Sequence, residues 1–204
     1  HKSVAITSAA PGVGKSFTAS NLAVVSAQAG HNVILVDCDM RRGVTHKYFG
    51  LPRTTSGLSD YLSEDSEPDE FMKSLEIPNL TLITSGDFPP NPAELLLKPR
   101  MQELVHKLEK QFDLVILDCP PVMAVTDPVI ITRYVGMRML VARFGETQPA
   151  ELLAAKQAIQ VAGRNVEGSI LNGYDISLSK RGQNYSYAYN YRYSYGSNKT
   201  RTVS

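Results

Sequence analysis

The stretch VAITSAAPGVGKSFTASNLAVV, residues 4–25, decides how this chain is expected to fold. It begins as a short run of β-forming residues, passes through a glycine-rich turn and continues as a helical pattern. The turn AAPGVGKS (9–16) matches the phosphate-loop pattern G-x-x-x-x-G-K-[ST] except at its first position, which is Ala9. Glycine-rich turns also join strands to helices in other folds, but the order of strand, loop, Gly-Lys-Ser and helix favours a phosphate-binding loop.

The residues of this loop that match the pattern are those that phosphate binding requires. Gly12 and Gly14 let the backbone turn so that successive N–H groups point into one concavity. Lys15 is predicted to place its ammonium against the β- and γ-phosphates, and the Ser16 hydroxyl to bind Mg²⁺. The amino end of the following helix adds partial positive charge.

Two further strand-like runs end in aspartate. VILVDCDMRR (33–42) carries Asp37 and Asp39, and LVILDCPP (114–121) carries Asp118. Because the carboxyl ends of parallel strands meet at one edge of a sheet, all three carboxylates are expected beside the phosphate loop. Asp118 is similar to a Walker B aspartate, which acts on Mg²⁺ through water. For any one aspartate alone, the alternative is a cap of a turn.

Strand-like and helical segments alternate along the chain. The strand-like runs are SVAITS (3–8), NVILVDC (32–38), NLTLITS (79–85), FDLVILDC (112–119), RMLVARF (138–144) and VEGSILN (166–172). Helical spacing groups Leu22, Val25 and Ala29, then Met101, Leu104, Val105 and Leu108, and then Leu152, Ala155, Ile159 and Ala162. This alternation predicts an α/β fold with a doubly wound, mostly parallel sheet of the P-loop NTPase type.

Three local features are less regular. Short helices are predicted in GLSDYL (57–62) and PDEFMKSL (68–75), and the helix after PPNP (89–92) should be interrupted or restarted at Pro99. Cys38 and Cys119 are expected to be small buried residues, a disulfide between them being the alternative.

The carboxyl-terminal part differs in composition from the rest. Residues 177–204 contain many Ser, Asn, Gly and Tyr and no acidic side chain, so we predict a domain over residues 1–176 and a mobile tail over 177–204. Six of the ten tyrosines alternate with other residues in this tail: Tyr185, Tyr187, Tyr189, Tyr191, Tyr193 and Tyr195. The formal net charge of +1 argues against a surface that binds polyanions generally.

In its combination of motifs, the chain resembles the bacterial tyrosine kinases of capsule and exopolysaccharide assembly. The motifs are AAPGVGKS, VDCDMRRG, GLSDYL, PPNPAELL, LVILDCPP, LVARFG, ILNG and the tyrosine cluster. The resemblance implies an autokinase that uses Mg²⁺ and ATP to phosphorylate the tyrosine cluster, mostly in trans, and that releases ADP. It implies that Asp37 acts as the base for the attacking hydroxyl or orients it, and that Ser16, Asp39 and Asp118 bind Mg²⁺. Nucleotide contacts are implied for Pro11, Gly12, Val13, Gly14, Lys15, Ser16, Phe17 and Asn172.

The same resemblance implies partners and a location. The parent protein would form a homo-oligomeric ring, meet a partner tyrosine phosphatase and be anchored by two helices, with this domain at the cytoplasmic face of the bacterial inner membrane. The upstream family pattern E-x-x-R-x-x-R, which packs into a neighbour, is missing here, so we expect a longer natural protein and a monomeric, weakly active fragment. The family's regulatory tyrosine after RRG is replaced by Val44, and Tyr48 is expected to pack structurally.

Three alternatives remain at this point. A MinD/ParA-type ATPase switch shares the fold, but its signature lysine falls at the position of Ala10. Alternating tyrosines also suit one face of a β-strand. Tyrosines among basic residues could stack on single-stranded nucleic acid, although no nucleic-acid-binding fold is recognisable, so nucleic acid is not expected as a partner.

Overall fold

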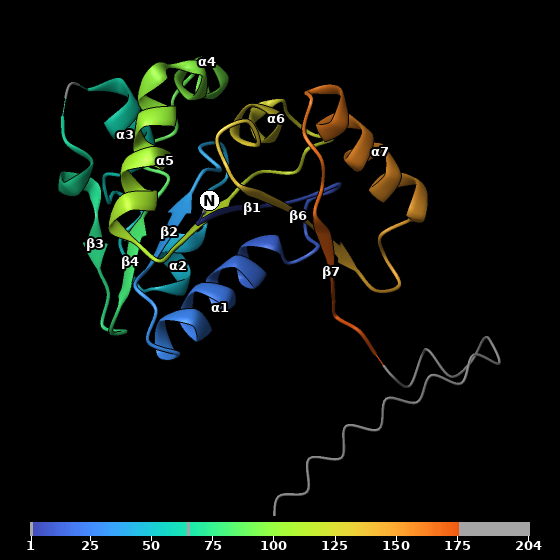
Figure 1. Cartoon of the computed structure of the whole chain (residues 1–204), viewed down its shortest axis with the longest axis horizontal. Coiled ribbons are helices and arrows are strands. Elements are labelled where there is room, and N and C mark those ends of the chain that lie inside the picture. The colour runs from blue at the N-terminus through green and yellow to red at the C-terminus, as the bar shows by residue number, and fades with distance from the viewer. Residues whose placement is uncertain (1, 65, 176–204) are drawn as a thin grey trace, which may run out of the picture. The chain divides into compact units, whose positions relative to one another are not determined.

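The computed structural model describes residues 2–64 and 66–175, which form a seven-stranded sheet flanked by helices (Figure 1). The strand order is β3-β4-β2-β5-β1-β6-β7, and every neighbouring pair is parallel except β3 with β4. The strands are β1 (Ser3–Ser8), β2 (Val33–Asp37), β3 (Lys73–Ser74), β4 (Leu80–Ile83), β5 (Leu114–Asp118), β6 (Met137–Arg143) and β7 (Gly168–Asn172). The helices are α1 (Lys15–Gln28), α2 (Thr45–Tyr48), α3 (Leu58–Ser63), α4 (Pro92–Leu97), α5 (Pro99–Gln111), α6 (Asp127–Ile131) and α7 (Pro149–Val161), with a 3₁₀ helix at Pro68–Phe71.

The predicted doubly wound, mostly parallel sheet is confirmed. Each of the six strand-like runs contains a strand, and the restart at Pro99 separates α4 from α5. β5 lies between β2 and β1, with Asp37 of β2 opposite Asp118 of β5 in the register. The loop after β1 and the aspartates after β2 and β5 therefore meet at one edge of the sheet.

The prediction for residues 68–75 is only half right. The segment begins as the 3₁₀ helix Pro68–Phe71 and then extends as β3, which pairs antiparallel with β4. Met72, between them, already has extended backbone angles. A short apolar segment fits a helix or a strand equally well, and here the exposed edge of β4 decides the outcome.

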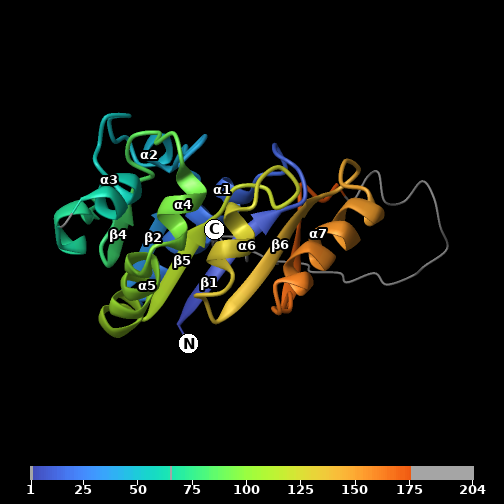
Figure 2. The ribbon, with the colours of Figure 1, turned by 90° about the horizontal axis from the view of Figure 1, so that it is seen from above.

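Helix α1 packs on the sheet through a different face from the one its large residues suggest. Its buried apolar residues are Ala19, Ala23 and Ala27, whereas Leu22 and Val25 are 38% and 62% exposed. Small side chains let the helix that follows the phosphate loop approach β1 closely, so the expectation from Leu22, Val25 and Ala29 was wrong. Figure 2 shows α4, α5, α6 and α7 in front of the strands in the view from above.

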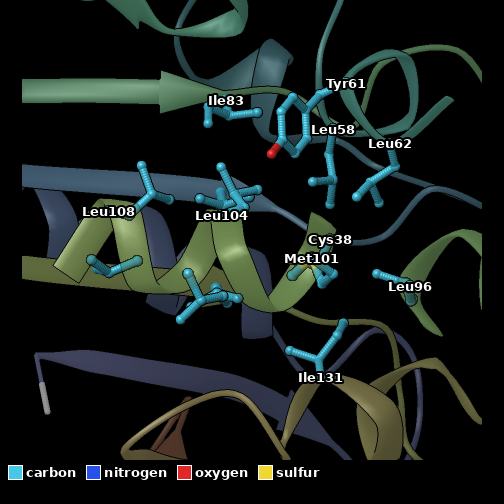
Figure 3. Close-up of a cluster of buried hydrophobic side chains, with 14 of the residues drawn as sticks. Cys38, Leu58, Tyr61, Leu62, Ile83, Leu96, Met101, Leu104, Leu108 and Ile131 are labelled. Atoms are coloured by element: carbon cyan, nitrogen blue, oxygen red, sulfur yellow. The ribbon is translucent and has the colours of Figure 1, made fainter. Parts of the chain in front are cut away.

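The larger core lies under α3, α4, α5 and α6. Met101, Leu104, Val105 and Leu108 of α5 are buried, as predicted. Figure 3 shows Leu104 and Leu108 beside β2, with Leu58 and Leu62 of α3 and Ile131 of α6 nearby. Cys38 joins this cluster, and Cys119 is also buried; both thiols are free, which confirms the prediction of small buried residues.

Helix α7 covers the other end of the same face. Ala155 and Ile159 are fully buried against Leu140 of β6, which confirms part of the predicted apolar face of this helix. In residues 2–64 and 66–175, no helix is long and apolar enough to cross a membrane. The tyrosine cluster and the predicted tail lie outside the described residues, so the boundary at 176 stays a prediction.

Candidate active site

The phosphate loop forms because two glycines adopt backbone angles that other residues avoid. Gly12 and Gly14 have φ values of 81° and 89°, and Gly14 is the left-handed residue that starts α1. A Cβ atom on Gly14 would also collide with the side chain of Asn172. The loop therefore needs glycine at this position for both its conformation and its contact with β7.

Asn172 braces this loop. Its Nδ2 donates a hydrogen bond of 2.9 Å to the Val13 carbonyl, and its Oδ1 accepts one of 2.9 Å from the Gly173 N–H. Val13 itself is buried in the core behind the loop. Of the residues predicted to contact nucleotide, Val13 and Asn172 thus support the loop, whereas Pro11, Gly12, Gly14, Lys15, Ser16 and Phe17 line the adjoining cavity.

Lys15 reaches two of the predicted carboxylates. Its Nζ lies 3.4 Å from Asp118 Oδ1, 3.7 Å from Asp39 Oδ2 and 3.1 Å from Ser16 Oγ. Burial lowers the pKa of Lys15, but the charges of Asp118, Asp39 and Asp37 outweigh it, so the pKa is raised. The ammonium is consequently a fixed positive charge at the amino end of α1.

Asp118 is the more deeply buried of the two carboxylates that Lys15 reaches. It is 0% exposed, and its Oδ2 has no hydrogen-bond partner in the structure. Burial raises the pKa of Asp118, while Lys15 and the Ser16 hydroxyl counteract this shift. A buried carboxylate oxygen without a donor is costly, and a cation or a water bound to one would relieve that cost.

Asp37 and Asp39 differ although they are two residues apart. Asp37 is fully buried: its Oδ1 accepts the Asp39 N–H at 3.1 Å, and its Oδ2 accepts the Thr45 hydroxyl at 2.7 Å and the Thr45 N–H at 3.1 Å. Burial and the charge of Asp118 raise the pKa of Asp37 to about 7. Asp39 instead lines the cavity, and its Oδ1 accepts the N–H groups of Arg41 and Arg42. The predicted role of Asp37 as a base stays a prediction, since in the described geometry both its oxygens are occupied.

We call the cavity at the loop the phosphate pocket. Its volume is about 370 Å³. Its lining residues are Pro11, Gly12, Gly14, Lys15, Ser16, Phe17, Asp39, Arg42, Val44, Tyr48 and Pro121. Tyr48 is 49% exposed and lies on this wall, so the expectation that it packs structurally was wrong.

Sequence reasoning missed two residues that hold the site together. Thr45 fixes Asp37, as described above. Asp127, the first residue of α6, is 0% exposed and binds Arg41 through two hydrogen bonds, Nε to Oδ2 at 2.9 Å and Nη2 to Oδ1 at 3.1 Å. A buried acid in the apolar segment VTDPVII was a signal that a partner cation had to exist.

The donors present suit a magnesium ion that arrives with a nucleotide. Ser16 supplies a hydroxyl, Asp39 and Asp118 supply carboxylates, and one of the Asp118 oxygens lacks a partner. Among the described residues, no three His, Cys, Asp or Glu side chains are grouped to hold a metal by themselves. Mg²⁺ commonly binds through one or two carboxylates together with substrate phosphates and waters, so the donor set fits.

Comparisons with known proteins agree with this geometry. A family model described as an AAA domain matches residues 1–134. The chain is 46% identical over 168 residues to a putative tyrosine-protein kinase in the cps region of Klebsiella pneumoniae, covering 82% of this chain and 23% of that relative. It is 41% identical over 176 residues to the tyrosine-protein kinase YwqD of Bacillus subtilis (strain 168), covering 86% of this chain and 74% of that relative.

Solved structures show the same likeness. The kinase domain of the Escherichia coli tyrosine kinase ETK superposes with a TM-score of 0.83 at 39% identity, covering 92% of this chain and 72% of that one. MinD of Pyrococcus horikoshii in complex with Mg-ADP superposes with a TM-score of 0.71 at 20% identity, covering 83% and 69% of the two chains, which shows a shared fold. The chain spans about a quarter of the length of the first curated relatives it matches.

Proposed function

This chain belongs to the bacterial tyrosine kinases, and on that premise we propose that it transfers the terminal phosphate of Mg-ATP to tyrosine hydroxyls. The acceptors are the tyrosines of its own cluster: Tyr185, Tyr187, Tyr189, Tyr191, Tyr193 and Tyr195. Transfer occurs mostly between copies of the chain.

The observation that carries this proposal is the cluster around Lys15. A lysine ammonium lies within 4 Å of two carboxylates at the start of α1, beside a carboxylate oxygen without a partner. This arrangement provides both charges that a metal-bound triphosphate needs: a cation for the phosphate oxygens and anions for the metal.

Each part then has a separate task. The loop N–H groups between Gly12 and Ser16 and the amino end of α1 bind the phosphates, and Lys15 neutralises charge on the β- and γ-phosphates. Ser16, Asp39 and Asp118 would hold Mg²⁺, which would supply electrostatic stabilisation of the charge that develops during transfer. Asn172 keeps the loop in shape through the Val13 carbonyl.

In the reaction, the tyrosine oxygen forms a bond to the terminal phosphorus while the bond from that phosphorus to the bridging oxygen breaks. ADP leaves, and the hydroxyl proton passes to a carboxylate and on to solvent. Asp37 is the predicted base or orienter, and Asp39 is the carboxylate that lines the phosphate pocket. Most of the rate enhancement in such a transfer comes from positioning and charge stabilisation.

The wider setting is also a proposal. We propose that copies of the parent protein assemble into a ring, that a tyrosine phosphatase reverses the modification, and that a part outside this chain anchors it at the cytoplasmic face of the inner membrane. Phosphorylation adds about −1.5 to −2 charges per tyrosine, so modification of several tyrosines would reverse the sign of the basic tail and weaken contacts between copies. Control of exopolysaccharide or capsule export would follow, in keeping with the relative named from a cps region.

The main rival is an ATPase switch without kinase activity. The MinD likeness supports only the fold. Ala10, on the phosphate loop, has no charge to offer to a neighbouring copy's phosphates. The kinase proposal also gives the tyrosine cluster a role, which the ATPase proposal does not.

Intact mass measurement after incubation with ATP and Mg²⁺ tests the proposal. We expect added phosphates that disappear when Lys15 is replaced by Met or the six cluster tyrosines by Phe. The longer parent protein is assayed in parallel, because assembly brings acceptors to neighbouring sites. Phosphate release from ATP with every tyrosine unmodified, in both proteins, would favour the ATPase switch.

A further inference from the structure

A second cavity of about 310 Å³ adjoins the phosphate pocket, and we call it the side pocket. The two cavities share Pro11, Asp39, Arg42 and Pro121. Asp39 is the one carboxylate that lines both. The boundary between a ligand in the side pocket and a nucleotide phosphate is therefore formed by these four residues, and Asp39 is its carboxylate.

The rest of the side pocket is small and apolar. Pro120, Ala124 and Val125 line it from the segment between β5 and α6. Proline side chains together with a few polar groups suit a planar ring that carries a hydroxyl, since most ligand pockets combine an apolar lining with a few orienting polar groups. The guanidinium of Arg41, which also lines the cavity, is already neutralised by Asp127.

Both walls of this pocket are fixed. On one side, the Pro120 carbonyl accepts a hydrogen bond of 2.6 Å from the Thr7 hydroxyl, and the Val122 N–H donates to the Ser8 carbonyl at 2.8 Å. On the other side, the segment that carries Asp39 and Arg41 is tied to α6 by the paired hydrogen bonds between Arg41 and Asp127. The cavity is thus part of the folded scaffold and does not require a loop to close.

We propose that the side pocket holds the aromatic ring of the acceptor tyrosine and directs its hydroxyl past Asp39 toward the phosphate pocket. This proposal rests on the kinase function proposed above and names its acceptor site. The occupant is a tyrosine of residues 185–195 from a second copy of the chain. β7 runs parallel to β6, so its carboxyl end leads residues 173–175 toward the edge where both pockets lie, and the tyrosines follow within about twenty residues.

The same geometry accounts for a choice between hydroxyl groups. Ser186 and Ser194 alternate with the tyrosines in the cluster. A serine side chain is too short to fill an apolar pocket while its hydroxyl reaches the shared wall, and it gains little from apolar burial. Tyrosine specificity therefore arises from the side pocket and not from the phosphate loop.

The test fills the pocket from its rim. Ala124 is exposed, so Ala124→Trp should fold normally and place an indole where the acceptor ring would lie; the chain contains no other tryptophan. Met123→Trp is the matched control, because it adds the same ring at the neighbouring exposed position that lines neither pocket. Both variants and the unmodified full chain receive Mg-ATP and a synthetic peptide of residues 184–196.

We expect Ala124→Trp to lower phosphate incorporation into the chain and the peptide by about 100-fold while the ADP dissociation constant stays within about twofold. Met123→Trp should behave as the unmodified chain. A second readout does not need turnover: N-acetyltyrosine amide should shift the methyl NMR signals of Ala124 and Val125 in the unmodified chain.

Other outcomes separate the two proposals. The side-pocket assignment is overturned if Ala124→Trp phosphorylates tyrosine normally. It is also overturned if the methyl signals of Ala124 and Val125 do not shift when N-acetyltyrosine amide is added. If the unmodified chain and its longer parent bind nucleotide but phosphorylate no tyrosine, the kinase function itself is overturned, and the acceptor site with it.

Discussion

The phosphate pocket and the side pocket share a wall, but the rest of each pocket is formed by different parts of the chain. The groups of the phosphate pocket that would face the phosphates are a glycine-rich backbone turn, the start of a helix and one lysine, and these lie within residues 11–17, although segments after β2 and β5 complete the lining. The side pocket draws its lining from the segments that follow β1, β2 and β5, and it is held together by a contact between Arg41 and Asp127, 86 residues apart. The cradle for the phosphates is therefore mostly local in the chain, whereas the acceptor site we propose depends entirely on segments that meet in the folded structure.

This difference predicts where substitutions act. A change in the phosphate loop should abolish nucleotide binding and everything that follows from it. A change in the side pocket should spare the nucleotide and affect only the acceptor.

Lys15→Met should reduce tyrosine phosphorylation by about 1,000-fold or more, because it removes the cation that faces the phosphates. It also leaves Asp118 and Asp39 without their positive neighbour, so thermal unfolding is measured alongside activity. Lys107→Met is the matched control: it removes a lysine whose partners, Glu67 and Asp69, are far from the site in sequence and exposed. Comparable activity of the two variants would contradict the role given to Lys15.

Asp37→Asn should change how stability depends on pH. The folded chain holds the pKa of Asp37 at about 7, above the ordinary value of 3.8, so folding must retain a proton that the unfolded chain has released. The free energy of unfolding that Asp37 contributes is complete below about pH 4 and is lost as the pH rises toward 7. Asparagine does not titrate, so this loss should be absent from the variant.

Denaturant unfolding without nucleotide or Mg²⁺ measures the effect. Relative to the unmodified chain, Asp37→Asn should gain about 3 kcal/mol between pH 4 and pH 7.5. Asp87→Asn removes an exposed carboxylate and serves as the control. A constant difference between Asp37→Asn and the unmodified chain across this range would show that Asp37 is ionised in the folded state.

A structural feature could be predicted from the sequence when the residues that form it are close together in the chain. The strands around the site, the phosphate loop and the restart at Pro99 each have a signal within a few residues, and the structure confirms the elements. The face of α1 was misjudged because apolar spacing favours Leu22 and Val25, whereas close packing on the sheet selects the alanines. The position of Tyr48 and the pairing of Arg41 with Asp127 depend on which segments meet in space, and no pattern in one segment encodes that.

Asp127→Asn tests the tertiary part of the site. An asparagine can accept only one of the two hydrogen bonds from Arg41 and carries no charge, so the wall that Arg41 forms should loosen. We expect the KM for the peptide of residues 184–196 to rise about tenfold, with kcat and the ADP dissociation constant changed by less than about threefold. A general loss of structure would instead weaken nucleotide binding as well and lower the thermal midpoint in proportion.

Arg41→Lys sharpens the same test. Lysine keeps the positive charge but cannot form the bidentate contact, so it should show the same rise in KM as Asp127→Asn. If Arg41→Lys has the same KM for the peptide as the unmodified chain, acceptor binding depends on neutralisation of the Asp127 charge and not on the fixed width of the side pocket.

Asn172→Asp should give the smallest effect and reports on the other pocket. The substitution keeps the oxygen that accepts the Gly173 N–H but removes the donor to the Val13 carbonyl, and it places a negative charge beside the loop. Loss of one such hydrogen bond is worth about 1 kcal/mol, so nucleotide affinity should fall about fivefold. Asn172→Ala separates the two causes, since it removes the donor without adding charge and should lose less. Because Asn172 lines neither cavity, the KM for the peptide at saturating ATP should not move in either variant; a rise in that KM would mean that the two pockets are coupled through the loop.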